Sequence, residues 1–167
     1  RQTDGVDRPL TVVVLADTHV RAGAEGRLPP EVYAAATDAD VILHAGDVLT
    51  ASLLDDLADR APLRAVLGNN DAGLEARLPE IDLVELAGVR IGLVHDSGPT
   101  KGRAARMRRR FPEADVVVFG HSHQPLDEEG LEGQRLFNPG SCTERRRSPH
   151  RTYGMLTVED GHLVDHR

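Results

Sequence analysis

The chain has 167 residues, of which 40% are apolar, and it carries a formal net charge of -7. These values predict one compact domain over residues 1–167 with a hydrophobic core, and they exclude a disordered or fibrous chain. The acidic balance also argues against duplex nucleic acid as a partner, because proteins that neutralise many phosphates carry a basic face.

Three further features predict a cytoplasmic protein. Cys142 is the one cysteine, so no internal disulfide asks for an oxidising compartment. No apolar run reaches the roughly 18 residues of a membrane span, so a membrane is not an expected partner. Residues 1–8 are polar, lack the order of a signal peptide and are expected to form a flexible N-terminal tail.

The first part of the chain alternates predicted strands and helices. Residues 10–16 (LTVVVLA) form a β-branched run typical of a strand buried on both faces. Pro29 and Pro30 suit the first turn of a helix, and Thr50 is expected to N-cap the next one. Strands are predicted at residues 10–16, 41–45 and 63–67, and helices at residues 30–37 and 51–58.

The second part changes character and favours hairpins. Ala87-Gly88 separates two apolar runs, which predicts a hairpin of residues 81–86 and 89–95. A helix over residues 101–110 and a strand over 116–119 should follow. The end of the chain is expected to be antiparallel, with strands near residue 127 and at residues 135–137, 152–158 and 162–165. Alternation followed by hairpins suggests helices packed outside two sheets.

Polar residues follow each predicted buried strand. In sheets with parallel strands, ligands collect beyond the carboxyl ends of the strands, so these five segments should surround one point. Residues two apart in an extended segment point to the same side, so Asp17 can share an ion with His19, and His121 with His123. The five segments are Asp17-Thr18-His19, His44-Ala45-Gly46-Asp47, Gly68-Asn69-Asn70-Asp71, His95-Asp96 and Gly120-His121-Ser122-His123.

This donor set predicts a metal centre. Gly46, Gly68 and Gly120 each precede a proposed ligand, and the lack of a Cβ permits sharp turns and close approach. Mixed carboxylate, imidazole and amide ligands favour Mn, Fe or Zn over Ca or Mg. Several ligands per ion, with one carboxylate shared, indicate two ions.

In this order, the motifs resemble those of the calcineurin-like metallophosphoesterase superfamily. The size of the chain and the Asn138-Pro139-Gly140-Ser141 segment resemble its small YfcE-type phosphodiesterase branch, and the resemblance runs from about residue 10 to residue 158. It implies an α/β fold, a four-layer αββα sandwich of two mixed sheets flanked by helices.

The resemblance also implies which residues bind the two ions. One ion would take Asp17, His19, Asp47 and His123, and the other Asp47, Asn69, His95 and His121, so that Asp47 bridges. Asp47, Asn69, His95 and His121 are the expected catalytic residues. The ions are expected to be Mn2+, with Fe, Zn or Ni as alternatives.

The expected reaction is hydrolysis of a small phosphate ester, most plausibly a diester, by attack of a hydroxide that bridges the two ions. The alternative is a binding module, because the retromer's vacuolar sorting subunit resembles this branch and serves as a scaffold. All seven ligand positions hold competent residues, which favours catalysis. The physiological substrate and the oligomeric state, including a homo-oligomer, stay open.

One departure from the family pattern affects the chemistry. Many members read Gly-Asn-His-Asp or Gly-Asn-His-Glu, and that histidine is thought to protonate the leaving group. Asn70 stands at this position, as an amide that has no proton to donate at neutral pH. The small branch commonly lacks the histidine too, so the departure fits this branch. The missing general acid argues against fast monoester hydrolysis.

Residues around the proposed ligands are interpreted with their alternatives. Asn70, Arg145, Arg146 and Arg147 are candidates for substrate binding, and the three arginines could equally be solvated. His44 is expected to support ligands without binding metal, whereas Asp71 and Asp96 are either orienting groups or turn residues. The arginines at 103, 106, 108, 109 and 110 could form a phosphate-binding patch, and are interpreted as a solvated helix face in preference to it.

Overall fold

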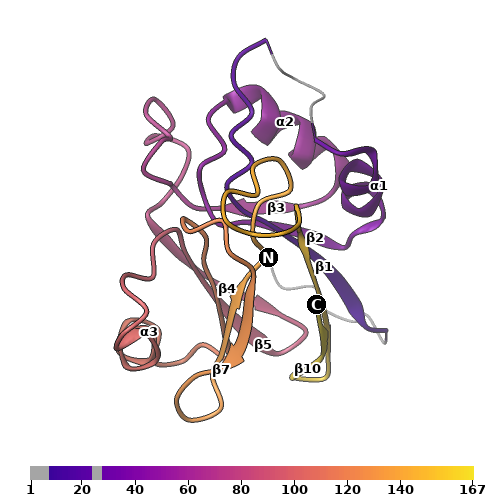
Figure 1. The fold of residues 1–167 in the computed structure, drawn as a ribbon. Coiled ribbons are helices and arrows are strands. Elements are labelled where there is room, and N and C mark those ends of the chain that lie inside the picture. Colours follow the sequence, from indigo (N-terminus) through magenta and orange to yellow (C-terminus); the bar gives the residue numbers. More distant parts are fainter. Residues whose placement is uncertain (1–7, 24–27) are drawn as a thin grey trace.

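The computed structural model describes residues 8–23 and 28–167, and in these parts it contains two five-stranded sheets and three helices (Figure 1). Two segments lie outside the described residues. They are residues 1–7, most of the predicted tail, and residues 24–27 in the loop that follows residue 21. Arg8 is described, and its guanidinium donates two hydrogen bonds of 2.6 and 3.0 Å to the Asp40 carboxylate.

The first sheet joins the N-terminal strands to the last two strands of the chain. Its members are β1 (Leu10–Leu15), β2 (Val41–His44), β3 (Leu63–Ala65), β9 (Gly154–Glu159) and β10 (His162–His166). They lie in the order β10-β9-β1-β2-β3, with β1, β2 and β3 parallel and β9 antiparallel to β1. The carboxyl ends of three strands therefore meet at one edge.

The second sheet begins with the predicted hairpin. Its strands are β4 (Ile81–Leu86), β5 (Val89–Val94), β6 (Val116–Val118), β7 (Leu126–Glu129) and β8 (Arg135–Asn138). Ala87 and Gly88 turn the chain with φ values of 48° and 80°, as a two-residue hairpin loop requires. The prediction of an antiparallel end is confirmed for the pairing of β7 with β8. It was wrong for the other side of β8, which pairs in parallel with β6 because the β7–β8 hairpin joins the sheet beside that buried strand.

The helices cover the outer faces of the two sheets. Helices α1 (Pro30–Asp38) and α2 (Ala51–Arg60) pack on the first sheet, and α3 (Arg103–Arg110) packs on the second through Met107. Thr50 precedes α2 as predicted, but it makes no capping bond because its hydroxyl donates to the Val20 carbonyl at 3.1 Å. None of the described helices is long and apolar enough to cross a membrane.

The prediction of a wholly solvated arginine face on α3 was wrong in part. Arg106 donates to the carbonyls of Ser97, Pro99 and Lys101 at 2.7–3.0 Å, and Arg103 donates to the Ser97 hydroxyl at 2.9 Å. The two half-buried arginines thus hold the loop that leads from β5 to α3, whereas Arg109 and Arg110 are exposed.

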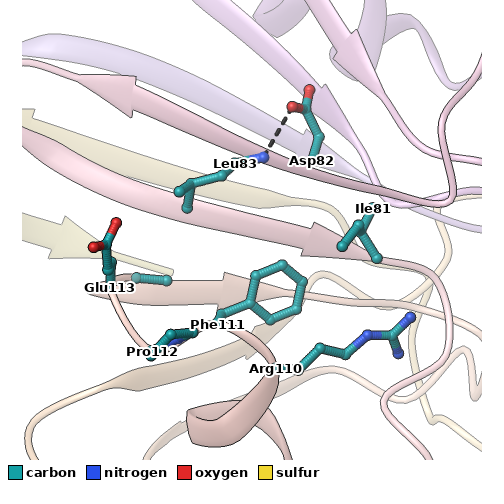
Figure 2. Close-up of a pocket in the computed structure, with 8 residues that line it drawn as sticks. Ile81, Asp82, Leu83, Arg110, Phe111, Pro112 and Glu113 are labelled. Carbon is teal, nitrogen blue, oxygen red and sulfur yellow. Dashed lines mark hydrogen bonds between the residues drawn. The ribbon is translucent and has the colours of Figure 1, made fainter.

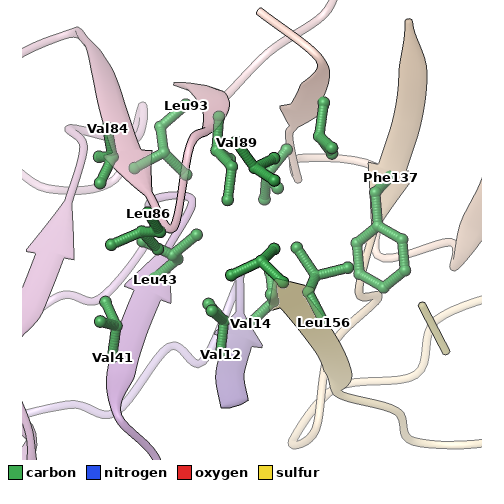
Figure 3. Packing of buried hydrophobic residues seen from close by; sticks show 14 of the residues in the cluster. Val12, Val14, Val41, Leu43, Val84, Leu86, Val89, Leu93, Phe137 and Leu156 are labelled. Atoms are coloured by element: carbon green, nitrogen blue, oxygen red, sulfur yellow. The ribbon is translucent and has the colours of Figure 1, made fainter. Parts of the chain in front are cut away.

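The main core lies between the two sheets (Figure 3). Val12, Val14 and Leu43 of the first sheet face Ile91 and Leu93 of the second, and all five side chains are fully buried. With helices outside each sheet, this arrangement confirms the predicted four-layer αββα sandwich.

Polar pairs also link the two sheets at both lateral edges. Arg64 on β3 donates twice to Asp82 on β4, with both distances 2.8 Å. At the opposite edge, His166 on β10 pairs with Asp127 on β7 at 2.5 Å. Each pair joins the terminal strand of one sheet to the terminal strand of the other.

Truncation between the sheets should destabilise the fold more than truncation at the surface. We expect Leu43→Ala to lower the free energy of unfolding by about 2–5 kcal/mol, because a buried cavity would replace the lost side chain. Leu131→Ala, at a leucine that is 46% exposed, is the control and should change it little. Urea unfolding of both variants checks this expectation, and equal losses would contradict it.

Candidate metal centre

All seven predicted ligands lie in loops at the same end of the two sheets. These loops follow the carboxyl ends of β1, β2, β3, β5 and β6, as the parallel pairing requires. The structure therefore brings the predicted side chains into one cluster, while their binding of metal stays a prediction. The seven residues are Asp17, His19, Asp47, Asn69, His95, His121 and His123.

Asp17 and Asp47 are the anionic centre of this cluster, and both are buried. Asp17 Oδ2 accepts a hydrogen bond of 2.9 Å from the backbone N–H of His121. Asp47 accepts from Asn70 at both oxygens, from the backbone N–H at 2.9 Å and from the side-chain amide at 2.8 Å. These bonds fix the carboxylate planes and leave Asp17 Oδ1 without a partner.

Two imidazoles turn their Nε2 atoms toward these carboxylates because their Nδ1 atoms are held from behind. His123 Nδ1 lies 2.8 Å from the Glu144 carbonyl, and His95 Nδ1 lies 2.7 Å from the Ala45 carbonyl. A carbonyl only accepts, so each Nδ1 carries a proton and, in the neutral His123 ring, Nε2 keeps its lone pair. His123 Nε2 lies 3.6 Å from Asp17 Oδ1, and His95 Nε2 lies 3.4 Å from Asp47 Oδ2.

His19 completes the buried part of the cluster. Its Nε2 lies 3.3 Å from Asp47 Oδ2 and 3.8 Å from Asp17 Oδ1 without forming a hydrogen bond to either. The carboxylate of Asp17, followed by that of Asp47, raises the pKa of His19 to about 9. A cation that bound here below that pH would displace a proton from the ring.

The unpaired atoms test whether a metal ion fits. Asp17 Oδ1, His19 Nε2 and His123 Nε2 are buried atoms without a hydrogen-bond partner, and one ligand atom from each residue lies within 4.8 Å of the others. Burying polar atoms without a partner lowers the stability of the folded state, whereas a divalent cation among them would bind all three. The donor set therefore fits a metal ion.

A second group of possible donors lies beside the first. Ligand atoms of Asp17, Asp47 and His95 also lie within 4.8 Å of one another. Asn69 Oδ1 extends this group, at 2.9 Å from His95 Nε2 and 3.3 Å from His121 Nδ1. Asp47 Oδ2 lies 3.3 Å from His19 Nε2 and 3.4 Å from His95 Nε2, and Asp17 Oδ1 lies 3.8 Å from both atoms. The bridging role of Asp47 stays a prediction, because Asp17 belongs to both donor groups.

The backbone at the cluster adopts left-handed conformations. Asp17, His19, Asp47, His121 and His123 have φ values of 53°, 46°, 61°, 74° and 61°. Each such residue costs of order 1 kcal/mol, and strain of this kind concentrates at functional sites. The sequence prediction assigned the sharp turns to glycines, whereas the structure places most of them at the ligands.

Glycines at the cluster instead permit close approach. A Cβ on Gly46 would lie 2.6 Å from His95 Nδ1, and a Cβ on Gly68 would overlap Asp47 Oδ1 and its backbone nitrogen. Neither position can accept a side chain without moving a predicted ligand.

Asp71 and His44 form hydrogen bonds with the loops that carry the predicted ligands. The buried Asp71 carboxylate accepts from the backbone N–H groups of Asp47, Leu49 and Gly68 at 2.8–2.9 Å, so it orients the β2 and β3 loops. His44 Nδ1 accepts from the N–H of Gly46 at 3.1 Å, and its Nε2 lies 2.9 Å from the Thr18 hydroxyl. His44 thus contacts loop residues rather than the open centre of the cluster.

The Asn138–Ser141 segment braces the β1 loop. The Ser141 hydroxyl donates to the Asp17 carbonyl at 2.8 Å, and the Thr143 hydroxyl donates to the Thr18 carbonyl at 2.7 Å. Sequence reasoning missed Thr143 and Glu144, because the second acts only through its carbonyl and neither belongs to a motif. Their place directly after Ser141 is the one available signal.

The predicted substrate-binding residues lie at the exposed rim. Asn70 is exposed but bound to Asp47, and Arg146 Nη1 donates to the His121 carbonyl at 3.4 Å. Arg145 donates to the Pro149 carbonyl at 3.4 Å, and Arg147 is exposed. Of the three arginines, only Arg146 contacts a residue of the cluster, so it is the arginine best placed beside an anion there.

Sequence and structure comparisons identify relatives of this chain. A family model described as the calcineurin-like phosphoesterase superfamily domain matches residues 10–161. A probable metallophosphoesterase of Methanothermobacter thermautotrophicus is 37% identical over 82% of this chain and 80% of its own length. Another from Methanocaldococcus jannaschii is 34% identical over 90% of this chain and 77% of its own length.

Solved structures show the same fold. A Streptococcus pneumoniae protein described as a predicted phosphoesterase superposes with a TM-score of 0.71 and 23% identity, covering 92% of this chain and 85% of that one. Wild-type Vps29 of Entamoeba histolytica, complexed with Zn2+, gives a TM-score of 0.75 and 22% identity, covering 92% and 89%.

Removing the Asp71 charge should loosen the cluster without removing a ligand. Asp71→Asn would place an amide N–H₂ against backbone donors, so we expect metal affinity to fall about 10–100-fold and unfolding free energy to fall by about 1–3 kcal/mol. Calorimetric Mn2+ titration and urea unfolding measure the two effects. Asp59→Asn, at an exposed position on α2, is the control, and unchanged metal affinity in Asp71→Asn would contradict the orienting role.

Acid should destabilise the metal-free protein through His44. Burial lowers the pKa of this ring to about 4, below its unfolded value of about 6.5, so the unfolded state binds a proton first as pH falls. Between pH 6.5 and pH 5 this should cost about 2 kcal/mol. Urea unfolding in chelator should show a correspondingly smaller loss for His44→Asn over the same interval; parallel curves for variant and wild type would refute the assignment.

Proposed function

The chain belongs to the calcineurin-like phosphoesterase superfamily, and we propose that it is a metal-dependent phosphodiesterase acting on a small phosphate diester. The observation that carries this proposal is the convergence of buried atoms without partners on Asp17, His19 and His123. A binding surface has no need for such a cluster, whereas a metallohydrolase does.

We propose two divalent ions, Mn2+ in the first place, with Fe, Zn or Ni as alternatives. Asp17, His19, Asp47 and His123 would hold one ion, and Asp47, Asn69, His95 and His121 the other. When bound, such a pair supplies Lewis acidity that lowers the pKa of water and offsets negative charge on a phosphate. Two dications exceed the charge of two carboxylates, so the site would attract an anion despite the acidic chain.

The residues on the solvent side of the cluster suit a phosphate ester. Asn69 and His121 are exposed, so substrate can approach from this side. Arg146 lies beside His121 at the rim and would bind a phosphate oxygen. In the reaction, a water oxygen forms a bond to phosphorus and gives up one proton to solvent. The bond from phosphorus to the leaving oxygen breaks, and that oxygen takes one proton from solvent.

Asn70 supports the choice of a diester with a good leaving group. Its amide donates to Asp47 Oδ2 at 2.8 Å, so it holds that carboxylate and offers no acidic proton to a departing alkoxide. A positioned general acid is worth about 10²–10⁴ in rate, and most for poor leaving groups. Aryl diesters should therefore be better substrates than simple alkyl phosphates.

The rival function is a protein-binding scaffold. The likeness to Vps29 admits this function, although at 22% identity it shows the fold alone. The two functions differ in what the cluster does, because a scaffold has no use for turnover. An assay of metal content and hydrolysis on the same sample therefore separates them.

Loss of the shared carboxylate should abolish turnover. We expect Mn2+-dependent hydrolysis of bis(p-nitrophenyl) phosphate by the wild type, and a loss of about 10³-fold or more in Asp47→Ala because a donor to both ions is missing. Bound metal, measured by mass spectrometry, should fall at both sites in Asp47→Ala, mainly at one in His19→Ala and mainly at the other in Asn69→Ala.

Asp59→Ala, at an exposed carboxylate on α2, is the control and should keep full activity and metal content. Full activity in Asp47→Ala would overturn the two-ion scheme. If the metal-loaded wild type hydrolysed no diester, the proposed catalysis would be rejected and the scaffold function would be supported.

A further inference from the structure

A pocket of about 340 Å³ adjoins the candidate metal centre. Asn69 and His95 form the wall that it shares with the centre, and Glu80, Asp96 and Arg110 supply charged groups around it. Leu67, Gly68 and Val94 line the rest. A molecule held at the centre can therefore extend into this pocket, which offers both hydrogen-bond acceptors and a cation.

A second pocket, of about 450 Å³, lies between the edge strand β4 and the turn after α3 (Figure 2). Its walls are mainly apolar, with Ile81 and Leu83 on one side and Phe111 and Pro112 on the other. Ile81 and Leu83 are 42% and 45% exposed, and they are two of the four large hydrophobic side chains that are exposed in the described part of the chain. Apolar side chains gathered at one place on a surface mark a binding site more often than scattered ones.

The two pockets adjoin at Arg110. This side chain lines both of them, and the adjacent residues Glu80 and Ile81 line one each. In Figure 2, Arg110 and Ile81 lie at the same end of the second pocket, and Glu113 lies at the other. Taken in sequence, the two pockets define a path that starts at Asn69 and His95, passes Arg110 and ends at the apolar walls. Among the described residues, no carboxylate forms an ion pair with Arg110.

Resting on the proposed phosphodiesterase function, we infer that this path binds the substituent that stays on phosphorus after hydrolysis, and that this substituent is a nucleoside. A diester has two substituents, and the one that does not leave must extend from the centre in some direction. The polar pocket suits a sugar, because Glu80 and Asp96 accept from hydroxyl groups. The apolar pocket suits a planar base, on which the Arg110 guanidinium can stack.

The test compares two diesters with the same leaving group. Thymidine 5′-(p-nitrophenyl phosphate) and methyl p-nitrophenyl phosphate release the same phenolate, so a difference in kcat/KM reports the retained half. We expect the wild type to prefer the thymidine ester by about 10-fold or more, since one group in an apolar pocket is worth that much.

Two variants locate the preference, and each has a matched control. Leu83→Ser and Arg110→Ala should lower kcat/KM for the thymidine ester about 5–10-fold and leave the methyl ester unchanged. Leu131→Ser changes a leucine of equal exposure elsewhere, and Arg109→Ala removes the neighbouring exposed arginine of α3. Both controls should behave as the wild type does.

Binding of thymidine 5′-monophosphate to the Mn2+-loaded protein, measured by calorimetry, gives a readout without turnover. Binding weakened by Leu83→Ser supports the path even if no diester is hydrolysed, in which case only the proposed catalysis fails. Hydrolysis of both esters without preference, or equal losses in both from Leu83→Ser, overturns the path and leaves the proposed function standing. A concentration-dependent dimer that Leu83→Ser abolishes, without nucleoside preference, would also overturn it and assign the pocket to a second copy of the chain.

Discussion

Two buried carboxylates and the Nε2 atoms of three imidazoles share one small space at the end of the sheets, and this electrostatic arrangement constrains the rest of the structure. Asp47 Oδ2 lies 3.3–3.4 Å from two ring nitrogens, and Asp17 Oδ1 lies within 3.8 Å of three. Electronegative atoms this close need a proton or a cation between them. In the metal-free protein the carboxylates respond by raising the pKa of His19, while the imidazoles lower that of Asp47 despite its burial.

The sandwich supplies the geometry that this arrangement needs. Parallel strands from both sheets end at the same level, so loops that are far apart in sequence meet there. The backbone then contributes the finer positioning, because Asp71 collects three N–H groups from two loops and the Ala45 and Glu144 carbonyls fix two ring tautomers. Much of the positioning of the centre thus comes from groups that are not predicted ligands, because their oxygen atoms are engaged in hydrogen bonds.

The sequence predicted the strands and the cluster well, for physical reasons. Continuous β-branched runs such as residues 10–16 are typical of buried strands, and the fold fixes the position of residues that directly follow such strands. Predictions from local pattern alone were weaker. Thr50 has the residue type of a cap, but the Val20 carbonyl from another loop takes its hydroxyl. No local pattern encodes contacts between separate segments. The pairing of β8 with β6 and the acceptor role of the Glu144 carbonyl are two such contacts, and the hydrogen bonds from Arg106 to the preceding loop are a third.

The left-handed backbone at five predicted ligands restricts which substitutions evolution can accept at these positions. Aspartate, asparagine and histidine are the non-glycine residues that enter this region most readily, and they are also the residues that bind the expected metals. Replacing Asp17 or His123 by most other residues would therefore raise the conformational energy of the backbone in the folded state, whether or not a metal is bound. Selection for folding alone would tend to keep these residue types in a descendant that had abandoned catalysis. An intact set of ligands in a relative is for this reason weaker proof of retained chemistry than the free, inward-facing donor atoms that the structure shows.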